Sequence, residues 1–540
     1  MSKIAIDFGT TNTVVAVWRE AIGAPETLRL PGLSAPAAEG QPPLIPSLLY
    51  VVDGHAPSVL AGQAVQDEGH DGSGDRRLFA SFKRGIAAHS RPLKRQIDGM
   101  GWTDDTAGRI FLSSVLQAAL AAEGNSIEEL VLTVPVQSFE KYLKWLRDET
   151  LSTLGPEAVE RVRIVDEPTA AALGYEVRAP GELILVFDFG GGTLDVSLVR
   201  MPLAREESSL LINLADDRYV PGQDAEARVL AKAGVVLGGD DVDNWLLDEL
   251  LRRNEVSRAE LGASYPQLKG AVEAVKVRLS THESAEVSVF DPDTSRVYNT
   301  TFTRAQLETL LDRHDFYTQI QRAIDKTLRA ARQRGIYPED IGAVLLVGGS
   351  SLIPSVERML RTMFGRERIY EHRPFEAVAH GALGLSMGVG LDDFLYHSYG
   401  IRHLSPISNR HEYEEIIPAG TRYPLEEAVE VVLAASRQGQ EAIELVIGEV
   451  EEGASGITEV MFGDHAILMV EDGMELHRVV PLNDEDGART VAHLDPPGVP
   501  GVDRIQAEFN VDDNRMLRVT VTDLHTERIL LRAAAVVELR

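Results

Sequence analysis

The clearest pattern of apolar and polar positions along the chain occurs twice. Residues 3–18 read KIAIDFGTTNTVVAVW, and residues 183–199 read LILVFDFGGGTLDVSLV. Each segment is an apolar run that ends in Asp-Phe-Gly, a short turn of Gly and Thr, and a second apolar run. Two apolar runs joined by a tight turn predict a β-hairpin. The repetition of one hairpin predicts two halves of related architecture.

Strand and helix patterns alternate in the rest of both halves. Buried strands are predicted at 127–135 (IEELVLTVP) and at 341–349 (IGAVLLVGG), each after a helix. Because leucines and alanines recur at helical spacing, one long helix is expected from about residue 304 to 334. Helices of small residues are expected at 168–175 and 381–389. This alternation predicts an α/β core with mixed sheets, since the hairpins are antiparallel.

From about residue 391 the pattern changes to short strands. They are expected at 443–450, 466–470, 505–511 and 517–521. Every second residue of 505–511 is apolar, and the Asp512-Asp513-Asn514 sequence that follows is a turn signal. We therefore predict an all-β, sandwich-like tail that continues to Arg540 without a further helix.

Two segments lack a regular period. Residues 31–46 are rich in Pro, Ala and Gly and are expected to form a surface loop. Residues 202–228 are polar and also look like an insertion.

Composition narrows the class of protein. Hydrophobic residues make up 44% and charged residues 25%, which excludes a disordered or fibrous chain. Asp and Glu total 83 against 53 Lys and Arg, so the net charge is −30. Such a charge repels nucleic-acid phosphates and anionic membrane surfaces, and neither is expected as a partner. Because cysteine is absent, disulfides, thiolate metal sites, iron–sulfur clusters and cysteine nucleophiles are excluded.

The lengths of the apolar runs also indicate where in the cell the protein is expected. Only Ile4-Ala5-Ile6 is apolar near the start, whereas the core of a signal peptide needs about 7–15 apolar residues. No stretch approaches the roughly 20 apolar residues of a membrane helix. We therefore expect a soluble cytoplasmic protein.

The two hairpin turns have the composition of a phosphate-binding site. Residues 9–12 (GTTN) and 190–193 (GGGT) offer backbone amides and hydroxyl groups, and glycine lets a phosphate approach the backbone closely. Asp7 and Asp188 end the two entering strands and suit a hydrated Mg²⁺ that bridges phosphates. The alternative is a pair of ordinary hairpins, which the matched repetition disfavours. The companion motifs of a protein kinase and of a P-loop ATPase are both absent.

Six motifs occur in the order found in a known family. They are IDFGTTNTVVAV, LTVP, VDEPTAAALGY, LVFDFGGGTLDVSLV, VLGGDDVDNWLLDEL and AVLLVGGSSLIP. They resemble the nucleotide-binding part of the seventy-kilodalton heat-shock chaperones of the DnaK type, within the actin, sugar-kinase and heat-shock ATPase superfamily. The tail is similar to the family's peptide-binding β-sandwich through IQAEFNVDDNRMLRVTVTD.

The resemblance implies a fold class and a set of domains. The fold would be α/β, with a two-lobed, actin-like ATPase domain built from duplicated ribonuclease H-like halves over residues 1–390. A linker would occupy residues 391–400. A small all-β sandwich domain would occupy residues 401–540, without a helical lid.

The resemblance also implies roles for single residues. Lys83, within RLFASFKRG, would lie beside the γ-phosphate and the attacking water, although a lone lysine is usually a solvated surface charge. The implied catalytic residues are Lys83, Glu167, Asp188 and Asp195. The implied metal ligands, mostly acting through water, are Asp7, Glu167 and Asp188. The implied nucleotide-binding residues are Asp7, Gly9, Thr10, Thr11, Asn12, Gly190, Gly191, Gly192, Thr193, Gly238, Gly239, Asp240, Glu273, Lys276, Ser280, Gly348, Gly349 and Ser350. For Glu273, Lys276 and Ser280 the alternative is a polar helix face.

The chain departs from the family pattern at several positions. Leu352 stands where an arginine usually stacks on adenine, and Leu143 where an arginine usually takes part in signalling between the domains. The linker reads VGLDDFLYHSYGI instead of an unbroken leucine run, so weaker coupling between the domains is expected. Arg163 matches a family residue that contacts J-domains, and the acidic neighbour Asp166, where asparagine is frequent, could weaken that contact.

These observations favour an ATP-dependent molecular chaperone whose slow hydrolysis controls the binding of unfolded or extended peptide. The implied cofactors are ATP or ADP and Mg²⁺, with K⁺ as a further candidate. The implied partners are a J-domain co-chaperone and a nucleotide exchange factor. One alternative is a regulatory nucleotide-sensing module whose β domain binds one dedicated protein. A sugar kinase of the same superfamily is disfavoured by the EPTAAALGY segment and by the β tail.

Overall fold

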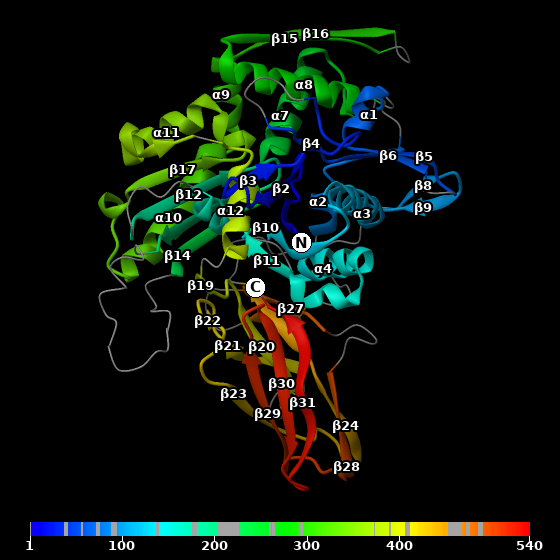
Figure 1. The fold of residues 1–540 in the computed structure, drawn as a ribbon, viewed down its shortest axis with the longest axis vertical. Helices are drawn as coiled ribbons and strands as arrows, with labels where there is room; N and C mark the ends of the chain where they lie inside the picture. The colour runs from blue at the N-terminus through cyan, green and yellow to red at the C-terminus, as the bar shows by residue number, and fades with distance from the viewer. Residues whose placement is uncertain are drawn as a thin grey trace. The chain divides into compact units, whose positions relative to one another are not determined.

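The computed structural model describes residues 2–36, 42–55, 58–71, 76–87, 94–136, 140–174, 181–202, 226–258, 261, 265–291, 295–371, 373–387, 390–405, 411–451, 467–470, 476–483 and 490–539. The chain forms two compact units, whose long segments meet in sequence between Leu391 and Asp392. Apart from residues 140–144, which belong to the second unit, the helices and two mixed sheets lie in the first unit, and the rest of the second unit is built from strands (Figure 1). Within the described ranges, every helix is too short or too polar to cross a lipid bilayer.

The first sheet of unit one is built around the first predicted hairpin. Its order is β11-β10-β1-β2-β3, and its strands are β1 Ser2–Asp7, β2 Asn12–Arg19, β3 Ala24–Thr27, β10 Ile127–Val134 and β11 Val162–Asp166. β1 pairs antiparallel with β2 and parallel with β10. The predicted strand at 127–135 is thus confirmed beside the hairpin.

The second sheet repeats this arrangement around the second hairpin. Its order includes β18-β17-β12-β13-β14, with β12 Leu183–Phe189, β13 Leu194–Arg200, β14 Glu226–Val235, β17 Ala343–Val347 and β18 Ile369–Tyr370. β12 pairs antiparallel with β13 and parallel with β17, as β1 does with β2 and β10. The repeated halves and the mixed sheets predicted from the sequence are therefore confirmed.

Small side chains allow two helices of unit one to pack at close range. They are α5 Glu167–Leu173 and α12 Ala377–Ser386, which correspond to the predicted small-residue helices. A Cβ atom on Gly381 of α12 would lie 1.7 Å from the carbonyl oxygen of Ala170. Any larger residue at Gly381 would therefore push the two backbones apart.

The remaining elements of unit one flank the two sheets. The helices are α1 Gln63–Asp67, α2 Phe82–Ala87, α3 Asp104–Ala122, α4 Glu140–Leu154, α7 Gly239–Arg253, α8 Tyr265–Thr281, α9 Arg304–Arg313, α10 Phe316–Gln333 and α11 Pro354–Phe364. The smaller strands are β4 Ile45–Pro46, β5 Leu48–Asp53, β6 Ser58–Ala61, β7 Leu78–Ala80, β8 Arg95–Ile97, β9 Met100–Trp102, β15 Ser284–Asp291 and β16 Arg296–Thr303.

Two expectations for unit one were wrong in part. The single helix expected over 304–334 is the pair α9 and α10, because Asp315 between them has a left-handed φ of 54° and breaks the helical path. The surface loop expected over 31–46 ends in β4, whose buried Ile45 and Pro46 pair with β2. Residues 37–41 of that loop and 203–225 of the second expected insertion lie outside the described residues.

The second unit is a β-sandwich, as predicted. Its strands are β20 Ser398–Leu404, β21 His411–Ile417, β22 Arg422–Tyr423, β23 Val429–Ala434, β24 Gln440–Leu445, β25 Ile447–Glu451, β26 Ile467–Val470, β27 Leu476–Pro481, β28 Thr490–Gly498, β29 Asp503–Val511, β30 Met516–Asp523 and β31 Arg528–Glu538. One sheet is ordered β21-β20-β25-β27-β26, a second β23-β29-β30-β31, and β24 pairs with β28. Apolar residues of both sheets, such as Tyr399 and Phe509, form one buried core.

One predicted strand of the tail is in fact two strands. Residues 443–450 divide at Val446 into the end of β24 and the start of β25, which belong to different sheets. The buried side chain of Asn483 spans this division, because its amide nitrogen donates to the carbonyl of Leu445 and its oxygen accepts from the backbone nitrogen of Ile447, both at 2.9 Å. The break therefore depends on a residue far along the chain.

The expected linker is also structured. Residues 390–394 form β19, which pairs antiparallel with β22 through Asp393 and Phe394. The hydroxyl of Tyr423 donates to the Asp393 carboxylate at 3.1 Å, and Arg422 forms an ion pair with Asp392. Residues 392–395 are thus part of the second unit rather than a free tether.

Candidate functional site

The two hairpin turns, which belong to different sheets, face each other. A Cβ atom on Gly191 would lie 2.2 Å from the hydroxyl oxygen of Thr11, and one on Gly192 would lie 2.7 Å from that of Thr10. Within the first turn, a Cβ on Gly9 would lie 2.0 Å from the carbonyl oxygen of Asn12. Glycine at these positions therefore permits a contact that no larger residue would allow.

The buried segment 45–47, which comprises β4 and Ser47, supports the first turn. The hydroxyl group of Ser47 donates to the carbonyl of Gly9 at 2.8 Å, and its backbone nitrogen donates to the carbonyl of Thr11 at 2.8 Å. Thr13 contacts the same hydroxyl at 3.0 Å. Ser47 was not among the predicted residues, because a serine next to a proline-rich segment reads as part of a loop.

Three carboxylates and one lysine gather at the ends of the strands that enter these turns. Asp7 ends β1, Asp188 lies near the end of β12, Glu167 begins α5 and Lys83 lies on α2. The Lys83 ammonium donates to Glu167 at 2.8 Å, and their side chains are only 6% and 11% exposed. Thr133 of β10 donates to Asp7 at 2.8 Å. The structure therefore brings together four residues that are far apart in the sequence.

The electrostatics of this group indicate an excess of negative charge. Burial raises the pKa of Asp7 to about 7, and the charge of Glu167 adds to this, against the opposing effects of Lys83 and Thr133. Burial also raises the pKa of Asp188 well above its usual value, helped by Glu167, Asp195 and Asp7. One lysine does not balance these carboxylates, so a bound cation would be stabilised here.

The predicted residue Asp195 lies beside this group. It pairs with Asp188 in the register of β12 and β13. Its carboxylate accepts a hydrogen bond from the backbone nitrogen of Val136 at 3.0 Å, just after β10 of the first sheet. Asp195 is thus held in place by both sheets.

The start of α7, with its N-cap Gly238, closes over the second turn. The backbone nitrogens of Gly239 and Asp240 donate to the carbonyls of Gly190 and Gly191 at 3.1 and 2.9 Å. A Cβ atom on Gly238 would lie 2.2 Å from the carbonyl oxygen of Gly191. These contacts place the predicted residues 238–240 directly on the glycine turn.

Residues from two further predicted segments meet the same loop. The hydroxyl of Ser350 donates to the carbonyl of Gly190 at 2.8 Å, and Lys276 of α8 donates to the carbonyl of Gly239 at 3.2 Å. Gly348 has a φ of +76°, and a Cβ atom there would lie 2.4 Å from the carbonyl oxygen of Phe189. A residue with a side chain at Gly348 would therefore strain the backbone as well as clash.

Other predicted residues lie nearby with fewer contacts to the site. The hydroxyl of Ser280 donates to the carbonyl of Lys276 on its own helix at 3.4 Å. Glu273, one turn before Lys276, acts through its charge on Asp243. Gly349 and Leu352 lie in the short helix at Gly349–Leu352, where a Cβ atom on Gly349 would lie 3.3 Å from Phe375.

The structure adds Asp243 to the predicted set. Its carboxylate accepts from Lys276 at 2.7 Å, and burial raises its pKa to about 7 against the effect of Lys276. Its other oxygen is buried and has no hydrogen-bond partner among the described residues. The signal was present in the sequence, because Asp243 lies on the apolar face of α7 with Val242, Leu246 and Leu250.

Arg84, next to Lys83, was also missed. Its guanidinium donates to both carboxylate oxygens of Asp241 at 3.2 and 3.0 Å, and lies 3.8 Å from Asp240. A Cβ atom on Gly192 would approach the Arg84 side chain at 3.3 Å. Arg84 therefore connects α2 with the start of α7 across the glycine turn.

Arg163 and Asp166, both considered for a J-domain contact, differ in exposure. The Arg163 side chain is 42% exposed, and its guanidinium donates to Glu129 at 3.2 Å. Asp166 is only 1% exposed and accepts from Lys232 at 2.8 Å. The acidic neighbour that was expected to weaken this contact is therefore a buried residue paired with Lys232. The J-domain contact itself stays a prediction.

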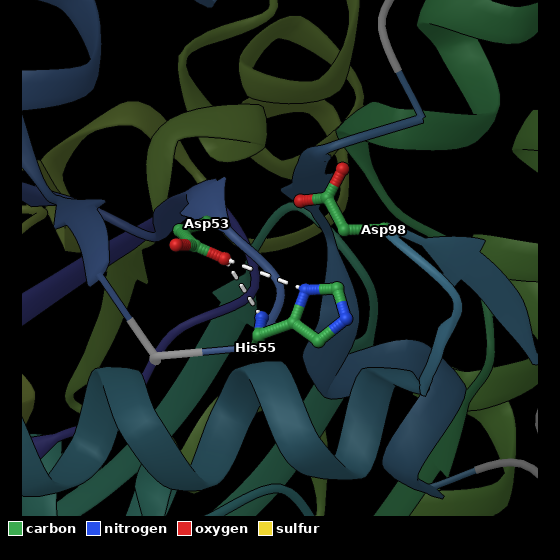
Figure 2. Close-up of side chains that lie close together, drawn as sticks. All are labelled: Asp53, His55 and Asp98. Carbon is green, nitrogen blue, oxygen red and sulfur yellow. Dashed lines mark hydrogen bonds and ion pairs between the residues drawn. The ribbon is translucent and has the colours of Figure 1, made fainter.

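A separate cluster of possible metal ligands lies outside the predicted site. Asp53, His55 and Asp98 are exposed, with ligand atoms all within 4.8 Å of one another, and Figure 2 shows the His55 ring beside Asp53. Asp98, however, accepts from Arg77 and from the backbone nitrogen of Gly54. The contact with Arg77 lowers the pKa of Asp98. The guanidinium of Arg77 is thus already a counter-ion for Asp98 of this cluster.

The residues at the two turns fit a magnesium–phosphate group. The two turns meet so closely at Gly191 and Gly192 that only glycine fits there. The carboxylates of Asp7 and Asp188 have raised pKa values, which the charge of a divalent cation would lower again. Oxygen ligands are also those that Mg²⁺ prefers. Asp7, Asp188 and Glu167 would hold the ion, and the turns the phosphates.

Comparison with known proteins gives one consistent result. The model of the family described as "Hsp70 protein" matches residues 92–205 and 223–456. The chain is 25% identical over 544 residues to proteins named "Chaperone protein DnaK" from Thermotoga neapolitana, Thermotoga petrophila and Thermotoga maritima. Each of these alignments covers 96% of this chain and 78% of the relative. The similarity therefore includes both units.

Proposed function

Because the chain belongs to the Hsp70 protein family, we propose that it is an ATP-dependent molecular chaperone. Its first unit binds Mg-ATP and hydrolyses it slowly, and the bound nucleotide controls how the second unit binds unfolded peptide. The observation that carries this proposal is the meeting of the two turns, where Gly191 and Gly192 lie against Thr11 and Thr10. No single hairpin would enclose a polyphosphate from both sides.

Each part of the site has a role in this proposal. Phosphoryl transfer to water depends mainly on positioning and on charge neutralisation. The backbone amides of residues 9–12 and 190–193 hold the phosphates. Asp7 and Asp188 would hold Mg²⁺ through water, and the ion would supply positive charge that offsets the negative charge of the phosphates. The site needs no residue that forms a covalent intermediate.

Lys83 and the nearby acids act on the reacting groups. The Lys83 ammonium stabilises negative charge on the transferred phosphate, and its contact with Glu167 at 2.8 Å fixes its position. Glu167 and Asp195 orient the attacking water through their carboxylates. Asp243 and Lys276, next to the loop at 238–240, bind the nucleoside end, where the unpartnered oxygen of Asp243 can accept a hydroxyl donor.

The second unit supplies the peptide site. The DnaK relatives are named chaperone proteins, and a β-sandwich can bind an extended peptide by adding its backbone to a sheet. In the described part of residues 392–539 all regular elements are strands, so the proposed peptide site is formed by strands. Stopped-flow release of a labelled peptide tests the proposed control by the nucleotide. Release at the same rate with ADP and with ATP would contradict it.

Stimulation of ATP hydrolysis by an unfolded peptide tests the proposed function. The full chain is assayed with Mg-ATP alone, with an extended apolar peptide, and with the same peptide after its apolar residues are replaced by serine. The proposal predicts slow basal turnover that rises only with the apolar peptide. Hydrolysis that no peptide changes would instead favour a regulatory module with one dedicated partner. The absence of any hydrolysis would refute the enzymatic role.

A further inference from the structure

A buried ion pair joins the two sheets of the first unit. The ammonium of Lys232 lies 2.8 Å from the carboxylate of Asp166, and both side chains are only 1% exposed. Asp166 is the last residue of β11 in the first sheet, and Lys232 lies within β14 in the second. The two residues are 66 positions apart in the sequence. A charge pair this deeply buried is costly to desolvate and needs a close, well-aligned partner.

On the side of the first sheet, the pair holds the start of α5. Asp166 is the N-cap residue of α5, a position where aspartate usually accepts a bond from the helix backbone. Here the Asp166 side chain makes no capping bond and accepts from Lys232 instead. The next residue is Glu167, which contacts Lys83. Whatever holds Asp166 therefore also holds the backbone from which the Glu167 side chain projects.

On the side of the second sheet, the pair is anchored beside the acidic residues. Lys232 pairs with Ser197 in the register of β13 and β14, and Gly234, two residues later, pairs with Asp195. Asp195 in turn pairs with Asp188 across the second hairpin. Lys232 thus lies in the same sheet as two of the carboxylates that surround the candidate metal position.

We infer that Lys232 is a positioning residue for ATP hydrolysis, an inference that rests on the proposed function. Through Asp166 it fixes the distance between Glu167 at the start of α5 and the Asp188–Asp195 pair of the second sheet. Lys232 itself touches neither metal nor nucleotide. α5 also packs against α12, where Gly381 lies against Ala170, and the contact between Lys232 and Asp166 restrains the start of α5.

Two charge-free double variants separate this positioning role from a contribution to stability. Asp166→Leu with Lys232→Met replaces the pair by apolar side chains that cannot hydrogen-bond. Asp166→Asn with Lys232→Gln also removes both charges but retains a polar contact between the strands. Both variants remove the two charges of the pair together, so both are expected to fold with similar thermal stability.

Single-turnover hydrolysis of Mg-ATP and the affinity for ATP are then measured for both double variants and for the wild type. We expect the apolar variant to hydrolyse about 10–100-fold more slowly, with ATP affinity unchanged, since only the transition state depends on the place of Glu167. The polar variant should recover most of the wild-type rate. Equal rates in the two double variants would overturn the inference, because stability alone would then explain the pair.

Amide hydrogen exchange of α5 provides a readout that does not depend on hydrolysis. The inference predicts that the first turn of α5 exchanges about 10-fold faster in the apolar variant than in the polar one, while α12 exchanges equally in both. Equal exchange of α5 in the two variants would also contradict it. If the wild type showed no hydrolysis, the proposed function would fail, and the exchange data would still decide whether Lys232 restrains Glu167.

Discussion

Two lysine–carboxylate contacts of the same length have their carboxylates on consecutive residues, Asp166 and Glu167, yet their surroundings differ. Lys83 contacts Glu167 at 2.8 Å, and Lys232 contacts Asp166 at 2.8 Å. The Lys83 and Glu167 side chains are 6% and 11% exposed, whereas those of Lys232 and Asp166 are both 1% exposed. The first contact keeps a small exposed area, and the second is sealed inside the fold.

The balance of charge separates the two contacts further. Glu167 belongs to a group in which it raises the pKa values of both Asp7 and Asp188, so Lys83 is shared among several carboxylates. Lys232 and Asp166 form an ion pair that is buried more deeply. An unbalanced, partly exposed group can bind a cation and respond to a ligand, whereas a deeply buried ion pair holds its two strands together. Under the proposed function, the same side-chain chemistry would therefore serve catalysis in one place and the positioning of Glu167 in the other.

The largest effect that sharpens this comparison is expected for turnover in Lys83→Met. Because the Lys83 charge acts mainly in the transition state, hydrolysis should fall by about 10²- to 10⁴-fold. ATP affinity should change by less than about threefold. Single-turnover hydrolysis and equilibrium ATP binding measure the two quantities.

Lys94→Met is the matched control for this variant, since Lys94 is an exposed lysine of the same unit. It should hydrolyse ATP like the wild type. Wild-type turnover in Lys83→Met would remove Lys83 from the site and leave its contact with Glu167 as a purely structural one.

The next effect concerns the free energy of unfolding, which the Lys232 variant should lower more than the Lys83 variant does. Lys232→Met leaves the Asp166 charge buried without its main counter-ion, which costs about 3–5 kcal/mol of unfolding free energy. Lys83→Met should cost clearly less, because the acids around it can take up protons or a cation. Urea unfolding of the full chain compares the two. An equal or larger loss in Lys83→Met would contradict the division between an accessible group and a sealed pair.

A smaller effect concerns pH. The pKa of Asp7 is raised to about 7 in the folded state, so between about pH 4 and pH 7 the folded protein binds more protons than the unfolded chain. The stability that this group contributes is therefore lost as pH rises through that window. Asp243, with its pKa also raised to about 7, acts in the same direction. In the absence of nucleotide and metal, Asp7→Asn should flatten the decline in unfolding free energy over this range.

Binding of Mg-ATP should reverse this protonation. A cation beside Asp7 favours its charged form, so binding at pH 7 should release up to about half a proton from Asp7. Titration calorimetry in buffers of different ionisation enthalpy measures the number released. Proton release equal in Asp7→Asn and in the wild type would show that Asp7 does not meet the cation.

Local sequence signals were sufficient for much of the fold and of the site. The two turns were predictable because Asp-Phe-Gly, the glycines and the flanking apolar strands all lie within 17 residues of each other in each hairpin. The alternation in 505–511 similarly predicted which side of β29 is buried, as Phe509 and Val511 show. That the two turns face each other was predictable from the repetition of the hairpin and from the family resemblance.

Features that depend on distant partners were not predictable in this way. Helical periodicity continues through His314 and Asp315, so nothing in it marks the left-handed residue that separates α9 from α10. The division of β24 from β25 depends on Asn483, 36 residues beyond Ile447. Lys232 and Asp166 are an isolated lysine and an isolated aspartate in the sequence, and only the pairing of strands from two sheets brings them together.

The most direct test of the central claim, that a nucleotide is held between the two turns, is thermal unfolding with Mg-ATP. At about 100-fold excess over the dissociation constant, binding adds about 2.7 kcal/mol and should raise the Tm of the first unit by about 3 °C. Gly191→Val, whose side chain would occupy the space against Thr11, should show no such rise. A wild-type Tm that Mg-ATP leaves unchanged, or an equal rise in Gly191→Val, would contradict the account.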